Sequence, residues 1–254
     1  MTVCVLAHAE VQSQALAVSV GFTQKILRLN QPTELSDNKK ELKSYPLNGP
    51  QIGVLYDMTF KKGLGMTVGL NYSYTAKISD WEDYKYDRFG KVVAVPIIET
   101  KYRNESHVLK LHADLQYKAP IAMDTWLIFY TGPSIQGVLK YNANDYYREK
   151  KIIESSDDKP VEIVKYRSDQ RELSEYYNVI NVTWGVGAGF QYKHIFVRGG
   201  YDFGLTNPRR VNQFGKMGYM DPADPSQPDN RLTRGRADQW QITVGYYFWQ
   251  RDKE

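Results

Sequence analysis

Apolar and polar residues alternate with a period of two along several stretches of this chain. Between residues 64 and 78 one face carries Leu64, Val68 and Leu70, and the opposite face carries Gly65 and Thr67. This alternation is typical of β-strands, in which successive side chains point to opposite faces. It predicts eight strands, which lie within residues 16–23, 50–60, 64–78, 106–118, 126–140, 180–192, 195–206 and 240–248. The strand at 126–140 begins apolar on both faces, so its phase stays open.

The predicted connections alternate in length, at about 22, 3, 27, 7, 36, 2 and 31 residues. Long loops at one end and short turns at the other are typical of an outer-membrane barrel. The short turns are expected at Lys61–Gly63, Ala119–Thr125 and Lys193–His194. The long loops at 79–105 and 141–176 contain β-like runs, which we expect to form hairpins beyond the barrel. The proline-rich loop at 207–237 is expected to lack regular structure.

The residue types on the two faces decide which one points inward. The polar faces of 64–78 and 180–192 carry Gly, Ser, Thr and Asn with one charge, Lys77, whereas a face in bulk water would carry many charges. Small residues suit the narrow interior of an eight-stranded barrel. The opposite faces carry bulky residues that suit lipid, and the aromatic girdles of such a barrel are predicted at its rims. The candidate girdle residues are Tyr72, Tyr74, Trp240, Tyr246 and Phe248.

A few charged residues fall on the predicted inward face. They are Asp57, Lys110, His112, Asp114, Arg198 and Asp202. Isolated ions in so narrow an interior are costly, so these residues are expected to pair. The pattern favours a structural ion-pair network that fills the barrel over a gated pore or proton path, because porin channels use about 16 strands.

Composition adds limits on location and chemistry. The 254 residues include 20 Tyr and one Cys, and the net charge of +4 does not by itself indicate nucleic acid binding. Residues 1–14 are interpreted as a signal-peptide remnant and N-terminal segment, since Ala7-His8-Ala9 resembles a cleavage site that would remove Cys4. The barrel domain is expected at 15–249 and a tail at 250–254. No cofactor is expected.

Three short motifs resemble a known family. Gly200 to Asn207 resembles its pattern Y-x-x-G-L-x-N, Thr131-Gly132-Pro133 resembles its G-P, and Val244 to Phe248 resembles its closing strand. Together they resemble the eight-stranded outer-membrane β-barrels of the PorT-like type, which are related in architecture to OmpA-like barrels. The resemblance implies a Gram-negative outer membrane, insertion by the barrel-assembly machinery and no catalytic residues. The chain departs from the family by continuing from Gln250 to Glu254 after its last aromatic residue.

Several functions remain open at this stage. The leading hypothesis is a non-enzymatic surface protein whose loops bind a partner or serve a structural role. A component of a secretion or envelope assembly is the second, and a soluble lipocalin-like barrel that binds an apolar ligand is the third. A protease site would use His107 or His112 with Asp80 or Asp83. A calcium site would use the acidic loop residues Asp221, Asp224 and Asp229. Lipopolysaccharide phosphates would bind the basic loop residues Arg148, Lys150, Lys151, Arg231, Arg234 and Arg236. Solvated loop charge is the simpler interpretation of the last two groups.

Overall fold

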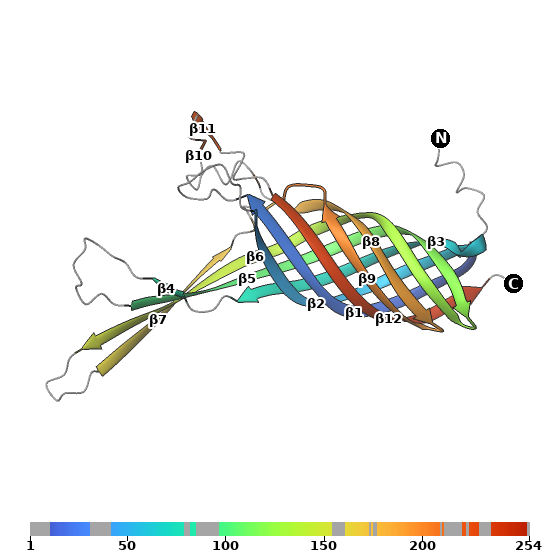
Figure 1. Ribbon diagram of the computed structural model, residues 1–254, viewed down its shortest axis with the longest axis horizontal. Coiled ribbons are helices and arrows are strands. Elements are labelled where there is room, and N and C mark those ends of the chain that lie inside the picture. Colours follow the sequence, from blue (N-terminus) through green and yellow to red (C-terminus); the bar gives the residue numbers. More distant parts are fainter. Residues whose placement is uncertain are drawn as a thin grey trace.

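The computed structural model describes most of the chain. The described residues are 11–30, 42–78, 82–84, 97–153, 161–172, 174, 177–208, 210, 220–221, 224–228 and 235–252. Eight antiparallel strands among them form a closed ring, in the order β1, β2, β3, β5, β6, β8, β9 and β12, with β12 paired to β1 (Figure 1). Closure leaves no open edge in the wall, which a sheet in lipid requires.

The ring strands are β1 (Val11–Asn30), β2 (Leu42–Phe60), β3 (Leu64–Ile78), β5 (Ile97–Ala122), β6 (Thr125–Ile153), β8 (Ile180–Tyr192), β9 (Ile195–Gly204) and β12 (Gly235–Asp252). Four further strands lie outside the ring: β4 (Glu82–Tyr84), β7 (Val161–Glu172), β10 (Met220–Asp221) and β11 (Asp224–Pro228). The all-β meander predicted from the alternation is therefore confirmed. No helix in the described ranges is long and apolar enough to span a membrane.

The short turns all lie at one end of the ring, here called the short-turn end. They are the 3-10 turn η2 (Lys61–Gly63), Met123–Asp124 and Lys193–His194. Ser13 of β1 pairs with Asp252 of β12, so both terminal strands also end there. The opposite end, here called the long-loop end, carries β4, β7, β10 and β11 (Figure 1).

The orientation of the side chains follows the alternation. The apolar residues Leu70, Val186 and Ile242 are 41%, 41% and 48% exposed on the outer surface, whereas Thr67 and Thr183 are buried in the interior. In the part of β6 up to Val138 the even-numbered residues such as Ile128 and Ser134 are buried and most odd-numbered ones face outward, which settles the phase that the sequence left open. The outer surface is therefore apolar and the interior polar, as in a membrane barrel.

Several predicted boundaries are wrong. The strands β1, β2 and β12 extend beyond the expected ranges 16–23, 50–60 and 240–248. The connection expected over Ala119–Thr125 is a two-residue turn, because β5 continues through Pro120 with a register shift between Pro120 and Ala122. A bulge removes the need for a ladder hydrogen bond from proline. The loop at 207–237 is not wholly irregular, since β10 and β11 pair within it.

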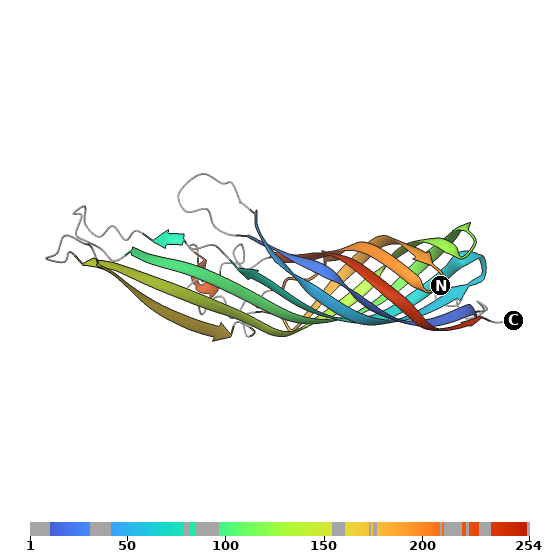
Figure 2. The ribbon, with the colours of Figure 1, turned by 90° about the horizontal axis from the view of Figure 1, so that it is seen from below.

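The strands β5 and β6 continue far beyond the ring at the long-loop end. Their pairing continues, with one register shift between His107 and Val108, as far as Ile97 opposite Lys150, and β7 adds along β6 from Asn142 to Ile153. The strand β4 pairs with the other side of β5. Figure 2 shows this four-stranded sheet, here called the protruding sheet, extending away from the barrel. The predicted extension of strands beyond the membrane is observed in β5, β6 and β7.

Candidate functional site

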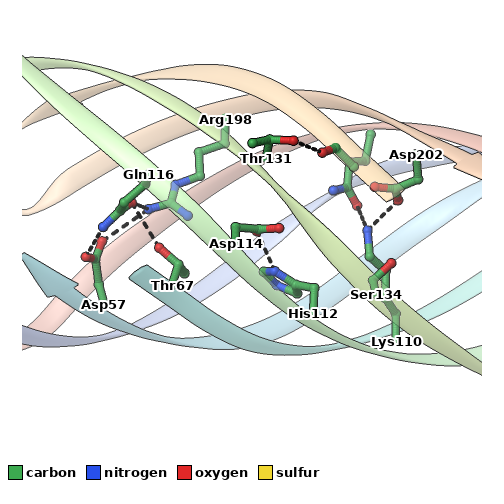
Figure 3. A network of polar contacts seen from close by, with 12 residues as sticks. Asp57, Thr67, Lys110, His112, Asp114, Gln116, Thr131, Ser134, Arg198 and Asp202 are labelled. Carbon is green, nitrogen blue, oxygen red and sulfur yellow. Dashed lines mark hydrogen bonds and ion pairs between the residues drawn. The ribbon is translucent and has the colours of Figure 1, made fainter. Parts of the chain in front are cut away.

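The charged residues predicted inside the barrel are buried there in three separate pairs. Asp57 contacts Arg198, Lys110 contacts Asp202, and His112 contacts Asp114 (Figure 3). All six lie on inward positions of the strands β2, β5 and β9. The pairs follow one another along the barrel axis, from Asp57 near the short-turn end to Lys110 and Asp202 toward the long-loop end. Every inward carboxylate thus has a basic partner, which lowers the cost of its burial.

Asp57 is the centre of the largest group of contacts. Its Oδ2 atom lies 3.2 Å from Nη2 of Arg198 and 3.1 Å from Nζ of Lys118, and it accepts a hydrogen bond of 2.7 Å from the Tyr247 hydroxyl. Its Oδ1 atom accepts a hydrogen bond from Nε2 of Gln116. Two cations and two further hydrogen-bond donors surround this carboxylate, so protein groups replace the water that it loses on burial. These contacts connect the strands β2, β5, β9 and β12.

The two other pairs are smaller. The Lys110 ammonium contacts Asp202 and also lies 3.4 Å from Oε1 of Gln241. Nδ1 of His112 lies 2.7 Å from Oδ2 of Asp114, while its Nε2 atom has no hydrogen-bond partner in the part of the chain that the structure describes. Nε2 packs against Gly69, where a Cβ atom would overlap it. The histidine side chain therefore fills space that the glycine leaves.

Glycines on inward positions make room for the largest interior side chains. A Cβ atom on Gly187 or Gly200 would overlap the ring or hydroxyl of Tyr130, and one on Gly245 would overlap Phe196. The glycines on the inward face are thus contact points for aromatic rings of neighbouring strands, since Tyr130 is directly opposite Gly187 and Phe196 is directly opposite Gly245.

Two apolar clusters flank the polar interior. One lies near the short-turn end and consists of Ala15, Ala17, Leu55, Phe196 and Tyr247. The other lies at the long-loop end and consists of Leu27, Leu47, Val108, Val138, Tyr141 and Ala237, with Tyr177 packed against it. The second is here called the apolar cap. The ion pairs therefore lie between two apolar clusters inside the ring.

A cavity of about 590 Å³ opens beside Asp57 at the short-turn end. Its lining includes Lys118, Trp126 and two residues of η2, Lys62 and Gly63. Four glutamines also line it: Gln12, Gln14, Gln191 and Gln250. Oε1 of Gln191 is buried and has no hydrogen-bond partner among the described residues. The described part of the chain includes no cluster of three or more His, Cys, Asp or Glu side chains that could hold a metal ion.

The predicted girdle residues lie on the outer surface near both ends of the ring. Near the long-loop end, the Tyr72 hydroxyl lies 2.7 Å from Nδ1 of His107, and Nε1 of Trp240 donates to Oε1 of Gln24 at 2.5 Å. Tyr74 accepts a hydrogen bond of 3.3 Å from Arg103. Near the short-turn end, Tyr246 and Phe248 are exposed. Such polar contacts at the tips of outward aromatic rings suit the interface between lipid and water.

Several residues of the interior network were missed from the sequence. Gln116 and Lys118 have the same parity along β5 as Lys110, and Tyr247 lies on the polar face of the last strand, so strand phase could have found them. Tyr130 was missed because the phase of its strand was open. Most residues weighed for a protease, a calcium site or lipopolysaccharide binding lie outside the described part of the structure. The structure does not describe Asp80, Asp229, Arg231 and Arg234. It describes only the backbone of Asp83, Asp221, Asp224, Arg148, Lys150 and Lys151.

A comparison with protein families now identifies the fold. Residues 12–208 match the model of the outer membrane protein beta-barrel domain. The chain belongs to this family. It is a protein of the bacterial cell outer membrane, and its short-turn end is the periplasmic end because such barrels have short periplasmic turns and long extracellular loops. The lipocalin-like alternative is excluded, since it requires a soluble barrel with an apolar interior. The family match does not extend to the narrower PorT-like type.

Solved structures give distant similarities. The attachment invasion locus protein Ail of Yersinia pestis, solved with the heparin analogue sucrose octasulfate, is 13% identical, with coverage of 93% of this chain and 99% of that chain and a TM-score of 0.36. Neisserial surface protein A is 10% identical, with coverage of 93% and 99% and a TM-score of 0.40. No curated protein matches the sequence.

Proposed function

We propose that this protein is a non-enzymatic surface protein that binds an extended segment of another protein along its protruding sheet. The observation that carries the proposal is the position of β7. One edge of β7 pairs with β6, and in the described part of the chain no strand pairs with its other edge. A 12-residue strand with a free edge offers a row of backbone donors and acceptors to another chain.

The length of the supporting strands favours the same conclusion. The strand β6 has 29 residues, whereas a strand needs about 9–11 residues to cross the hydrocarbon. The additional residues do not serve membrane insertion, and they hold β7 away from the bilayer. The ion pairs and apolar clusters of the interior argue against solute passage as the main function, so recognition is assigned to the extracellular part.

The test compares binding by two forms of the full-length protein on the surface of bacteria. In one form residues 146–168 are replaced by a two-residue Asn-Gly turn between Asp145 and Asp169, which shortens the β6–β7 hairpin and leaves β6 unchanged up to Asp145. A panel of immobilised extracellular-matrix proteins serves as the set of probes. We expect the native form to retain at least one of them and the shortened form to lose that binding. Equal binding by both forms would overturn the proposal, and heat-modifiable gel migration verifies that each barrel is folded.

A role in an envelope assembly is the second candidate, and the periplasmic cavity favours it. Lys118 and Gln191 line this cavity, and the buried Oε1 atom of Gln191 has no hydrogen-bond partner among the described residues. A photo-crosslinking residue at the exposed position Gln12 tests it in living cells. Discrete crosslinked adducts with envelope proteins that depend on Lys118 would support the assembly role, and adducts unchanged by Lys118→Met would count against it.

Outer-membrane lipid and lipopolysaccharide are proposed partners of the outer surface, and the barrel-assembly machinery is the proposed partner during insertion. The outer surface is apolar between two aromatic belts, and Arg103, His107 and the exposed Lys140 lie near its extracellular end. These basic groups stand at the level where phosphates of the outer leaflet are expected. Nucleic acid is not a proposed partner.

A further inference from the structure

The extracellular half of the barrel interior contains a lysine without a counter-charge. Lys25 lies on an inward position of β1 and is 5% exposed. Among the described residues it makes no ion pair or hydrogen bond. The buried carboxylates already have partners: Asp57 has Arg198 and Lys118, Asp202 has Lys110, Asp114 has His112, and Asp238 has Arg28 and Arg236. An ammonium group buried alone is costly unless something neutralises it.

Three other buried donors near Lys25 also lack partners among the described residues. They are Nε2 of Gln51, Oγ1 of Thr75 and Oγ of Ser106. These residues lie on β2, β3 and β5, which follow β1 in the ring, so four neighbouring strands each contribute one donor. Thr75 is directly opposite Ser106, and Gln51 is opposite Ser73, two residues before Thr75. The four donors therefore form one patch of the inner wall.

A glycine brings two strands of this patch close together. Lys25 is opposite Leu47 of β2, and Gly49 is the next inward residue of that strand. Gly49 packs against the backbone of Tyr74 and Thr75, where a Cβ atom would overlap it. Because Gly49 has no side chain, the backbones of β2 and β3 approach each other closely at this point, next to Lys25.

The apolar cap covers this patch from the extracellular side. Leu27 is the next inward residue of β1 after Lys25, and Tyr141 is directly opposite Ser106. Both belong to the cap, and their apolar surfaces keep bulk water away. In such surroundings the attraction between Lys25 and an opposite charge is stronger than in water.

We propose that Lys25, Gln51, Thr75 and Ser106 hold one small monovalent anion of the halide type inside the barrel. All four groups are hydrogen-bond donors, and the patch contains no carboxylate, so its chemistry selects an anion over a cation. The anion neutralises Lys25 and satisfies the two hydroxyl groups. Among the described residues the buried Oδ1 atom of Asn181 on β8 also has no hydrogen-bond partner, and water between it and Lys25 is the competing arrangement.

The test uses chloride and bromide as the probes on the full-length protein folded in detergent. At constant ionic strength, with gluconate replacing chloride, one-site linkage predicts that the ratio of folded to unfolded protein rises tenfold for each tenfold rise in chloride above its dissociation constant. We expect this dependence in the native protein and in Lys140→Met, which removes an exposed charge at a similar height. We expect no dependence in Lys25→Met.

A second pair of variants keeps the test decisive if Lys25→Met fails to fold. Thr75→Val and Ser106→Ala each remove one hydroxyl group at nearly constant volume, and each is expected to raise the dissociation constant for chloride about tenfold or more. Crystals grown in bromide should show anomalous scattering beside Lys25. The proposal is overturned if native protein and Lys25→Met respond equally to chloride, if neither hydroxyl variant changes the response, or if only water occupies the position.

Discussion

Replacing Asp57 with asparagine tests whether the interior ion pairs hold the barrel together. The substitution keeps the size of the side chain and removes the charge that faces Arg198 and Lys118 at 3.2 Å and 3.1 Å. Two buried cations are then left without a carboxylate, and breaking a buried pair in this way costs about 3–5 kcal/mol. With a urea dependence of about 2 kcal/mol per M, the unfolding midpoint should fall by about 2 M.

The assay is reversible unfolding in lipid vesicles, followed by tryptophan fluorescence and by heat-modifiable gel migration. Asp124→Asn is the matched control, because it removes one negative charge at an exposed turn position whose φ of 58° asparagine tolerates. The control should stay within about 0.5 kcal/mol of the native protein. The reasoning is refuted if Asp57→Asn is as stable as this control, since Asp57 would then not balance the two cations.

Two further predictions concern the packing of the interior and the position of the outer face in the membrane. Gly200→Ala should lower stability by about 1–3 kcal/mol, because its Cβ meets the Tyr130 hydroxyl, and the loss should vanish in a Tyr130→Leu background. The adjacent control Gly199→Ala, whose Cβ meets nothing closer than 3.9 Å, should be tolerated, and a similar loss there would contradict the assignment. Leu70→Arg, near the middle of the outer face, should cost about 2–4 kcal/mol in vesicles, against about 0–1 for Leu64→Arg at the periplasmic rim; equal costs would argue against the membrane position.

The strands and their inward faces could be predicted from the sequence because lipid and a narrow interior demand opposite residue types on alternate positions. This reasoning worked for 64–78 and 180–192, where one face is almost free of charge. It did not set the phase of β6, where Trp126 to Tyr130 are apolar on both faces, because Ile128 and Tyr130 fill the interior beside glycines of β8 and β9.

The contacts between particular residues could not be predicted in the same way. Strand phase indicates that Asp57 and Arg198 share the interior, but only the register and stagger of the closed ring place them at one height. The unpaired state of Lys25 is likewise a property of the assembled barrel, since no local pattern distinguishes it from Lys110. The length of β6 beyond the membrane depends on pairing with β7, which the charged sequence of that region signals only weakly.

The most direct test of the outward orientation is a nitroxide scan of β3 in lipid vesicles, with Cys4 replaced by serine and one cysteine introduced at a time over residues 64–78. Collision rates with oxygen, which concentrates in the hydrocarbon, report exposure to lipid. The structure predicts a period of two, with high rates at Leu70 and Tyr72 and low rates at Gly69 and Asn71. High oxygen collision rates at the odd-numbered positions instead, or no alternation along the strand, would contradict the account.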